Sequence, residues 1–241
     1  VRTHNRVAGL AQLEGMVRLL EETEASLSTW RPDSELSRLN RHPVGESSRL
    51  PGSLCAVWPE LVYWHRQTDG LFDPTIGALS EAWGIREGGQ IPSPEELGTA
   101  RSRTGFSQLE FESKTCRVTR RAEVMLDAGA FGKGEALRRV ATTFASDPSW
   151  MVDLGGQIAV SDQTGAMVWS VAIAHPRYRD RAVLEVDLAT GSIATSGVSE
   201  RSQVIEGRWV AHILDPRSGE PVHRAFSVSV WSPDALTADI L

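Results

Sequence analysis

The hydrophobic pattern changes character along the chain, and this change constrains the fold more than any other feature. In the first half, apolar residues recur at helical spacing, most clearly in Val7–Leu27 and Pro51–Asp69. The second half carries short alternating runs that predict strands at Trp150–Leu154, Ile158–Ser161, Val168–Ala174, Ala182–Leu188, Ser192–Thr195, Arg208–Leu214 and Phe226–Trp231. Helices followed by mostly antiparallel strands predict an α+β fold rather than a parallel βαβ array.

Capping and turn residues locate the ends of several elements. Asp33 or Ser34 is suited to cap a short helix that starts at Glu35. Gly70 lies where a left-handed residue would end the Pro51–Asp69 helix, and Pro94 suits the first turn of another helix. The remaining predicted elements are hairpin strands at Phe106–Phe111 and Cys116–Thr119 and helices at Gly134–Ser146 and Pro233–Leu241.

Length and composition exclude several classes of protein. The 241 residues contain no internal repeat or low-complexity linker, so we expect one compact domain over residues 1–241. With 41% apolar residues and a net charge of −6, the chain is unlike a disordered segment or a general nucleic-acid binder. The longest apolar stretches, such as Val228–Trp231, predict no membrane span. Cys55 and Cys116 alone cannot build a disulfide framework or a four-sulfur zinc site.

The segment Leu126–Gly134, LDAGAFGKG, directly precedes a predicted helix and suggests a binding loop. Its small residues leave backbone amides accessible, and a helix N-terminus favours phosphate. Lys133 adds a cation, and Asp127 can accept hydrogen bonds from ribityl or ribose hydroxyls or orient the loop. The segment matches neither the P-loop nor the dinucleotide fingerprint. A glycine-rich turn with a solvated lysine remains the alternative.

Asp239 interrupts the apolar face of the C-terminal helical segment. A buried carboxylate needs a partner, because an unpaired buried charge is costly. A hard cation such as Mg²⁺ is one possible partner. An arginine partner or simple exposure to solvent is the alternative.

Three other motifs have ordinary structural interpretations when each is taken alone. Asp73-Pro74-Thr75 is typical of a cap after a helix stop, and Asp153–Gly156 is typical of a hairpin turn. His212 lies on a predicted alternating strand, where a half-buried and hydrogen-bonded imidazole is commoner than a catalytic one.

In chain order, these segments resemble FAD:protein FMN transferases of the ApbE type. The segments that carry the resemblance are Ser28–Asn40, Gly70–Thr75, Asp127–Gly134, Asp153–Gly156, Ala194–Gly197, His212–Gly219 and Ala238–Asp239. Each is short, but their order is specific, and together they extend from about Ser28 to Leu241. The resemblance implies an α+β fold with FAD in a cleft. It also implies Mg²⁺-dependent transfer of FMN from FAD to a threonine or serine hydroxyl of an acceptor flavoprotein, with release of AMP.

The resemblance also assigns roles to individual residues. Those implied to contact FAD are Trp30 (an aromatic at the flavin site), Leu71, Phe72, Asp73, Asp127, Lys133 and Ile213. The implied metal ligands are the Ala130 backbone carbonyl and the Asp239 carboxylate. His212, beside Ile213, is the candidate general base for the acceptor hydroxyl.

The sequence departs from the family pattern at three places. The loop reads DAGAFGKG where DLGGIAKG is common, so Phe131 enlarges one lining residue. The usual Met-Gly-Thr opening strand is missing before Val1, and a further threonine metal ligand would lie beyond Leu241, so we expect both ends to be truncated. Two alternative functions stay open: an Mg²⁺-dependent FAD pyrophosphatase and a non-catalytic FAD-binding protein. The family suggests the cell envelope, and a cytoplasmic location is equally compatible with this segment.

Overall fold

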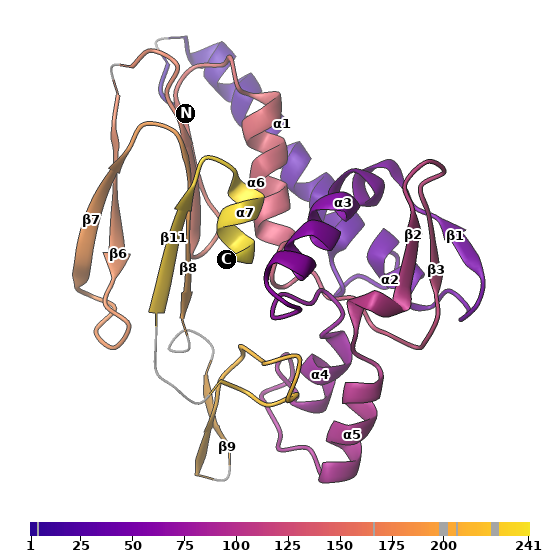
Figure 1. Ribbon diagram of the computed structural model, residues 1–241. Helices are drawn as coiled ribbons and strands as arrows, with labels where there is room; N and C mark the ends of the chain where they lie inside the picture. The colour runs from indigo at the N-terminus through magenta and orange to yellow at the C-terminus, as the bar shows by residue number, and fades with distance from the viewer. Residues whose placement is uncertain (4, 166, 198–201, 206, 223–226) are drawn as a thin grey trace. The chain divides into compact units, whose positions relative to one another are not determined.

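The chain folds into two compact units, each assembled from separate stretches of sequence. The computed structural model describes residues 1–241 except 4, 166, 198–201, 206 and 223–226. Unit 1 comprises Val1–Glu24, Phe131–Ser199 and Phe226–Leu241, and unit 2 comprises Ala25–Ala130 and Glu200–Ala225 (Figure 1).

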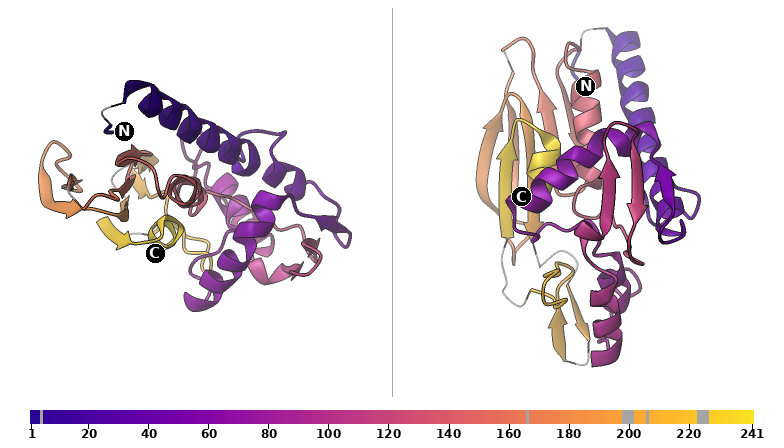
Figure 2. Two further views of the ribbon diagram at one scale, coloured as in Figure 1. Left: turned by 90° about the horizontal axis from the view of Figure 1, so that it is seen from above. Right: turned by 45° about the vertical axis from the view of Figure 1, so that its right-hand side comes forward.

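Unit 1 is built on an antiparallel sheet with strand order β11-β8-β5-β4. Its strands are β4 (Trp150–Asp153), β5 (Gln157–Ser161), β8 (Gly191–Gly197) and β11 (Ser227–Ser232), and a separate hairpin consists of β6 (Trp169–Ala174) and β7 (Ala182–Leu188). Helices α6 (Gly132–Thr143) and α7 (Ala235–Ile240) pack against each other and against this sheet (Figures 1 and 2). Helix α1 (Arg6–Leu27) adds Met16 to a core that includes Leu137 and Trp150.

Unit 2 is mainly helical. Its helices are α2 (Glu35–Asn40), α3 (Gly52–Gln67), α4 (Gly77–Ala82), α5 (Pro94–Ser102) and a 3₁₀ turn at Phe106–Gln108. A small antiparallel sheet has the order β1-β3-β2, formed by β1 (Ser47–Arg49), β2 (Leu109–Glu112) and β3 (Arg117–Arg120), and a second pair consists of β9 (Gln203–Ile205) and β10 (Arg208–Val210). Trp58 of α3 packs against the rings of Phe106 and Phe111, which fastens the helix to the β2 segment.

A second core cluster in unit 2 joins α4 and α5 to the chain that follows β10. Leu79 and Trp83 pack with Val210 and Leu214, and the Trp83 indole donates a hydrogen bond to the Gly219 carbonyl at 2.8 Å. A disulfide between Cys55 and Cys116 links the first turn of α3 to the residue before β3, with a Cα–Cα distance of 5.7 Å. These contacts hold the segments that carry the expected site residues of this unit.

The structure confirms the α+β class, with helices early in the chain and antiparallel strands late. Two strand predictions were wrong at their ends. The Phe106–Phe111 strand begins as a 3₁₀ turn, because the Phe106 side chain packs into the core and its amide binds Asp73. The Arg208–Leu214 strand ends at Val210, because Leu214 bridges to Pro221 instead, so His212 lies in a bend rather than on a strand.

Several short elements were not predicted, namely β1, α4 and β9. Phe226, where the last strand was predicted to begin, lies outside the described residues, and β11 is described from Ser227 onward. In the described part of the chain, no helix has the length and apolar character needed to cross a membrane.

Candidate functional site

The turn between α3 and α4 is held in shape by the carboxylate of Asp73. Asp73 is buried, and its Oδ1 accepts hydrogen bonds from the Thr75 amide at 2.7 Å and from the Thr75 hydroxyl at 2.5 Å. Its Oδ2 accepts from the Phe106 amide at 3.1 Å, and Thr75 Oγ1 accepts from the Gly105 amide at 2.7 Å. The carboxylate therefore cross-links this turn to the start of the 3₁₀ turn.

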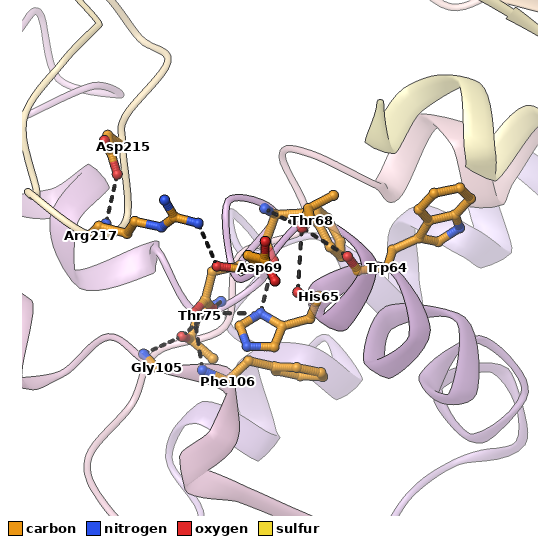
Figure 3. Close-up of polar contacts among 11 residues, drawn as sticks. Trp64, His65, Thr68, Asp69, Thr75, Gly105, Phe106, Asp215 and Arg217 are labelled. Carbon is orange, nitrogen blue, oxygen red and sulfur yellow. Dashed lines mark hydrogen bonds and ion pairs between the residues drawn. The ribbon is translucent and has the colours of Figure 1, made fainter.

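The last turn of α3 fixes the other side of the same loop. The Phe72 carbonyl lies 2.9 Å from His65 Nδ1, and the Phe72 amide donates to Thr68 Oγ1 at 3.0 Å (Figure 3). The Phe72 side chain is buried, whereas the Leu71 side chain is 55% exposed. Of the three residues expected to contact a nucleotide here, only Leu71 presents its side chain to solvent.

The segment that contains His212 and Ile213 belongs to the same unit and is tied to this turn. Arg217 Nη2 donates to the Asp69 carbonyl at 2.7 Å, while the Arg217 amide is held by Asp215 Oδ1 at 2.8 Å (Figure 3). His212 and Ile213 are both half-buried, and the Ile213 carbonyl accepts from the Val222 amide at 2.9 Å. The contact between Arg217 and Asp69 brings two of the expected site segments together.

The start of the glycine-rich segment is attached to the same turn through Asp127. Its amide donates to the Pro74 carbonyl at 2.7 Å, and its Oδ1 accepts from the Gly129 amide at 2.6 Å. Asp127 Oδ2 forms an ion pair with Arg86. Asn40 of α2 holds the preceding residue, because its amide group makes hydrogen bonds of 2.8 and 2.9 Å with the backbone of Leu126. Asp127 is therefore a buried carboxylate in a fixed orientation, and it also contacts the loop that follows it through the Gly129 amide.

Trp30 is the most exposed of the aromatic residues expected at the site. Its side chain is 69% exposed, and the guanidinium carbon of Arg86 lies 4.9 Å from the ring centroid, within the range of a cation–π contact. Arg86 also donates a hydrogen bond to Thr29 Oγ1. Sequence reasoning missed Arg86, because it lies in a turn between Gly84 and Gly89 with no motif around it.

Trp30 also lines a cavity of about 330 Å³ in unit 2. Three arginines, Arg41, Arg103 and Arg120, line it together with a single acidic residue, Glu81. Arg120 is buried, and this burial lowers the pKa of its guanidinium. The cavity wall is therefore predominantly positive beside the exposed indole.

In unit 1, the buried carboxylate of Asp239 pairs with the start of α6. Asp239 Oδ1 lies 3.0 Å from Lys133 Nζ, and Oδ2 accepts from the Gly134 amide at 2.8 Å. The Asp239 side chain is 4% exposed and that of Lys133 is 41% exposed. The partner that the buried acid requires is a lysine and a helix amide, not the arginine considered from the sequence. Two residues assigned to one site, 106 positions apart, are thus in direct contact.

The residues around Asp239 fit a divalent cation in one respect. A buried carboxylate oxygen is the kind of ligand that Mg²⁺ prefers, and the partly exposed Lys133 shows that a cation is stabilised at Oδ1. Within the described residues there is no cluster of three or more His, Cys, Asp or Glu side chains suited to hold a metal ion. Further ligands would therefore be backbone carbonyls, water or substrate phosphates. Ala130, expected to supply such a carbonyl, is half-buried and is the last residue of its stretch in unit 2.

The expected residues thus fall into two sets. Lys133 and Asp239 belong to unit 1, whereas the others belong to unit 2: Trp30, Leu71, Phe72, Asp73, Asp127, Ala130, His212 and Ile213. Within unit 2, hydrogen bonds connect the turn of Asp73 to Asp127 through Pro74 and to the His212 segment through Asp69.

Comparison with known proteins places this arrangement in a family. A model of the ApbE family matches residues 2–241. The FAD:protein FMN transferase of Vibrio cholerae is 33% identical over 230 residues, which cover 92% of this chain and 69% of that protein. The crystal structure of the ApbE protein of Thermotoga maritima superposes with a TM-score of 0.90 at 29% identity, covering 99% of this chain and 79% of the other.

The apo flavinyl transferase ApbE of Pseudomonas stutzeri gives a TM-score of 0.86 at 27% identity, covering 99% of this chain and 76% of the other. The family model and both structures span the two units of the fold. The chain belongs to the ApbE family.

Proposed function

We propose that this chain is an FAD:protein FMN transferase that attaches FMN to a threonine or serine of an acceptor flavoprotein and releases AMP. Its relatives carry that name over most of the chain. The observation that supports it best is the pairing of buried Asp239 with Lys133 and the Gly134 amide at the first turn of α6. A lysine at the N-terminus of a 12-residue helix is suited to a diphosphate.

The proposed reaction is a displacement at phosphorus. The acceptor hydroxyl oxygen forms a bond to the phosphorus on the FMN side of FAD, the bond to the bridging oxygen breaks, and AMP leaves with that oxygen. His212 is proposed to take the hydroxyl proton. Lys133 is proposed to contact the phosphate oxygens, and Asp127 and Trp30 to bind the flavin nucleotide, with the Leu71–Asp73 turn and Ile213 lining its site.

We assign Asp239 as the carboxylate ligand of Mg²⁺, and the Ala130 carbonyl as a second ligand on the strength of the family resemblance. When bound, Mg²⁺ would reduce the negative charge of the diphosphate that repels an incoming hydroxyl oxygen. With the metal bound, Lys133 would contact the substrate phosphates instead of Asp239. The Gly134 amide would keep the Asp239 carboxylate oriented through Oδ2.

Incubation with FAD, Mg²⁺ and an acceptor that carries a threonine in a short Ser/Gly/Ala-rich segment tests the proposal. We expect the acceptor to gain the mass of one FMN group, with one AMP released for each modified acceptor. AMP release that does not depend on the acceptor would instead identify an FAD pyrophosphatase. FAD binding without AMP release would identify a non-catalytic flavin-binding protein.

The variant Asp239→Asn tests the assigned metal ligand. We expect its Mg²⁺-dependent transfer to fall by at least about 100-fold, because an amide oxygen lacks the charge that holds the cation. Asp187→Asn, at an exposed position of β7 in the same unit, serves as the matched control and should keep wild-type activity. Wild-type transfer by Asp239→Asn, read from flavin fluorescence of the acceptor in a gel, would remove Asp239 from the site.

A further inference from the structure

The side chain of Arg86 joins three segments of unit 2 that are distant in sequence. Its guanidinium forms an ion pair with Asp127 Oδ2, donates to Thr29 Oγ1 and lies over the ring of Trp30, with Cζ 4.9 Å from the centroid. Two of these partners, Trp30 and Asp127, are residues assigned to flavin binding. No motif and no assigned role includes the arginine that connects them.

The backbone around Arg86 supports a fixed position for this side chain. Arg86 follows α4 in a turn closed by hydrogen bonds from the amides of Glu87 and Gly89 to the Gly84 carbonyl, at 2.9 and 2.8 Å. Gly84, Gly88 and Gly89 all have positive φ, a conformation that residues with side chains rarely adopt. The turn therefore presents one long side chain from a closed backbone loop.

The contacts of Arg86 differ in how far they are removed from solvent. The Asp127 side chain is 8% exposed and that of Arg86 is 25% exposed, so their ion pair is largely removed from solvent and less screened than a surface pair. Trp30, by contrast, is 69% exposed. With the guanidinium over one face of the indole, the opposite face stays accessible to a flat aromatic ligand.

We propose that Arg86 is a positioning residue of the flavin site: it orients the Asp127 carboxylate and the Trp30 ring together, before FAD arrives. This inference rests on the proposed function, in which both partners contact the flavin nucleotide. Asp127 Oδ1 is already held by the Gly129 amide, so Arg86 at Oδ2 completes the fixation of the carboxylate. A planar guanidinium, with its five N–H donors, is better suited than a lysine ammonium to pair with a carboxylate, donate to a hydroxyl and lie over a ring at once.

The experiment compares Arg86→Met and Arg86→Lys with a matched control, Arg121→Met. Arg121 forms an ion pair with Glu110 in the same unit, but both side chains are more than half exposed. We expect the dissociation constant for FAD, measured by calorimetry with Mg²⁺ present, to rise about tenfold or more in Arg86→Met. Arg86→Lys keeps the charge but not the stacking, so its dissociation constant should be intermediate, and Arg121→Met should bind like the wild type.

Two further readouts separate positioning from a general effect on folding. Because Arg86 contacts the proposed flavin-binding residues Asp127 and Trp30, the variants should raise KM for FAD more than they lower kcat. In a Trp30→Leu background, Arg86→Met should weaken FAD binding by a smaller factor than in the wild type, because the shared contact is already lost. Thermal unfolding of each variant confirms that it is folded at the assay temperature.

The outcomes are distinguishable. A wild-type chain that binds no FAD would overturn both the proposed function and this inference. A wild type that binds FAD, with a folded Arg86→Met that binds equally well, would overturn the inference alone. If Arg86→Met raises the dissociation constant for FAD by the same factor in the wild type and in the Trp30→Leu background, the proposed joint positioning is also contradicted.

Discussion

At the scale of single residues, the buried carboxylates of Asp73 and Asp239 are each held by more than one hydrogen-bond donor. Asp73 accepts three hydrogen bonds from Thr75 and Phe106, and Asp239 is held by Lys133 and the Gly134 amide. These networks resolve ambiguities that the sequence left open. The cap interpretation of Asp73 was wrong, because Ile76 is the N-cap of α4 and the Asp73 carboxylate instead holds a turn through Thr75 and Phe106. The buried position expected for Asp239 is confirmed, since its side chain is 4% exposed.

His212 is the residue whose role most needs a direct test. In the variant His212→Ala, we expect FMN transfer to fall by about 10²–10⁴-fold while FAD binding is retained, because only proton removal from the acceptor hydroxyl is lost. The measurement is single-turnover transfer with saturating FAD and Mg²⁺. His175→Ala, in the loop between β6 and β7, is the control. Near-normal transfer by His212→Ala would show that another group takes the proton from the acceptor hydroxyl.

Glu135, in the first turn of α6, predicts a pH dependence of stability. Its side chain is 5% exposed, and this burial raises its pKa above the ordinary 4.5, although Arg138, at 2.7 Å, opposes the shift. The folded state therefore binds a proton more tightly than the unfolded state. The stabilising contribution is present below pH 4.5 and is lost as the pH rises through the folded-state pKa.

The variant Glu135→Gln should remove this dependence. Urea unfolding from pH 4 to 8 should show the free energy of unfolding of the wild type falling relative to that of Glu135→Gln as the pH rises. Glu21→Gln, at an exposed position of α1, should follow the wild type at every pH. Parallel pH curves for wild type and Glu135→Gln would contradict the raised pKa.

At the scale of elements, the structure depends on links between segments that the local pattern does not reveal. Helix α5 follows its sequence signals closely, since Ser93 at the N-cap and Glu96 at N3 form a complete capping box on either side of Pro94. Helix α4 has only six residues, and it is held by the hydrogen bond from the Gly77 amide to the Met125 carbonyl and by Trp83 packing in the core. Its existence depends on partners far away in the sequence, and this is why periodicity did not predict it.

The disulfide between Cys55 and Cys116 is another such link, and it predicts an effect of reductant. The bridge closes a loop with a sequence separation of 61, so its loss should cost about 4 kcal/mol of unfolding free energy through the entropy of the unfolded chain. The double variant Cys55→Ala/Cys116→Ala should show this loss in denaturant unfolding and be insensitive to dithiothreitol. Equal stability of the wild type with and without reductant would contradict a structural bridge.

At the scale of the whole molecule, the class of fold could be predicted because it depends on the order of helical and alternating patterns. For the candidate site, the sequence predicted individual residues but not the contacts between them. Lys133 and Asp239 were both named from the sequence, but their ion pair across 106 positions depends on the packing of α6 against α7. Arg86 had no signal at all, because its three partners lie at Thr29, Trp30 and Asp127 and converge only in the folded unit.

The close packing of α6 against α7 also limits which residue can occupy position 134. A Cβ atom on Gly134 would lie 2.6 Å from the Asp239 Cβ and 2.8 Å from the Ala235 carbonyl oxygen, closer than real contacts allow. Even alanine would force the two helices apart and carry the assigned metal ligand away from its backbone donor. While α6 and α7 keep this packing and Asp239 keeps its place, the space at position 134 admits no side chain larger than that of glycine.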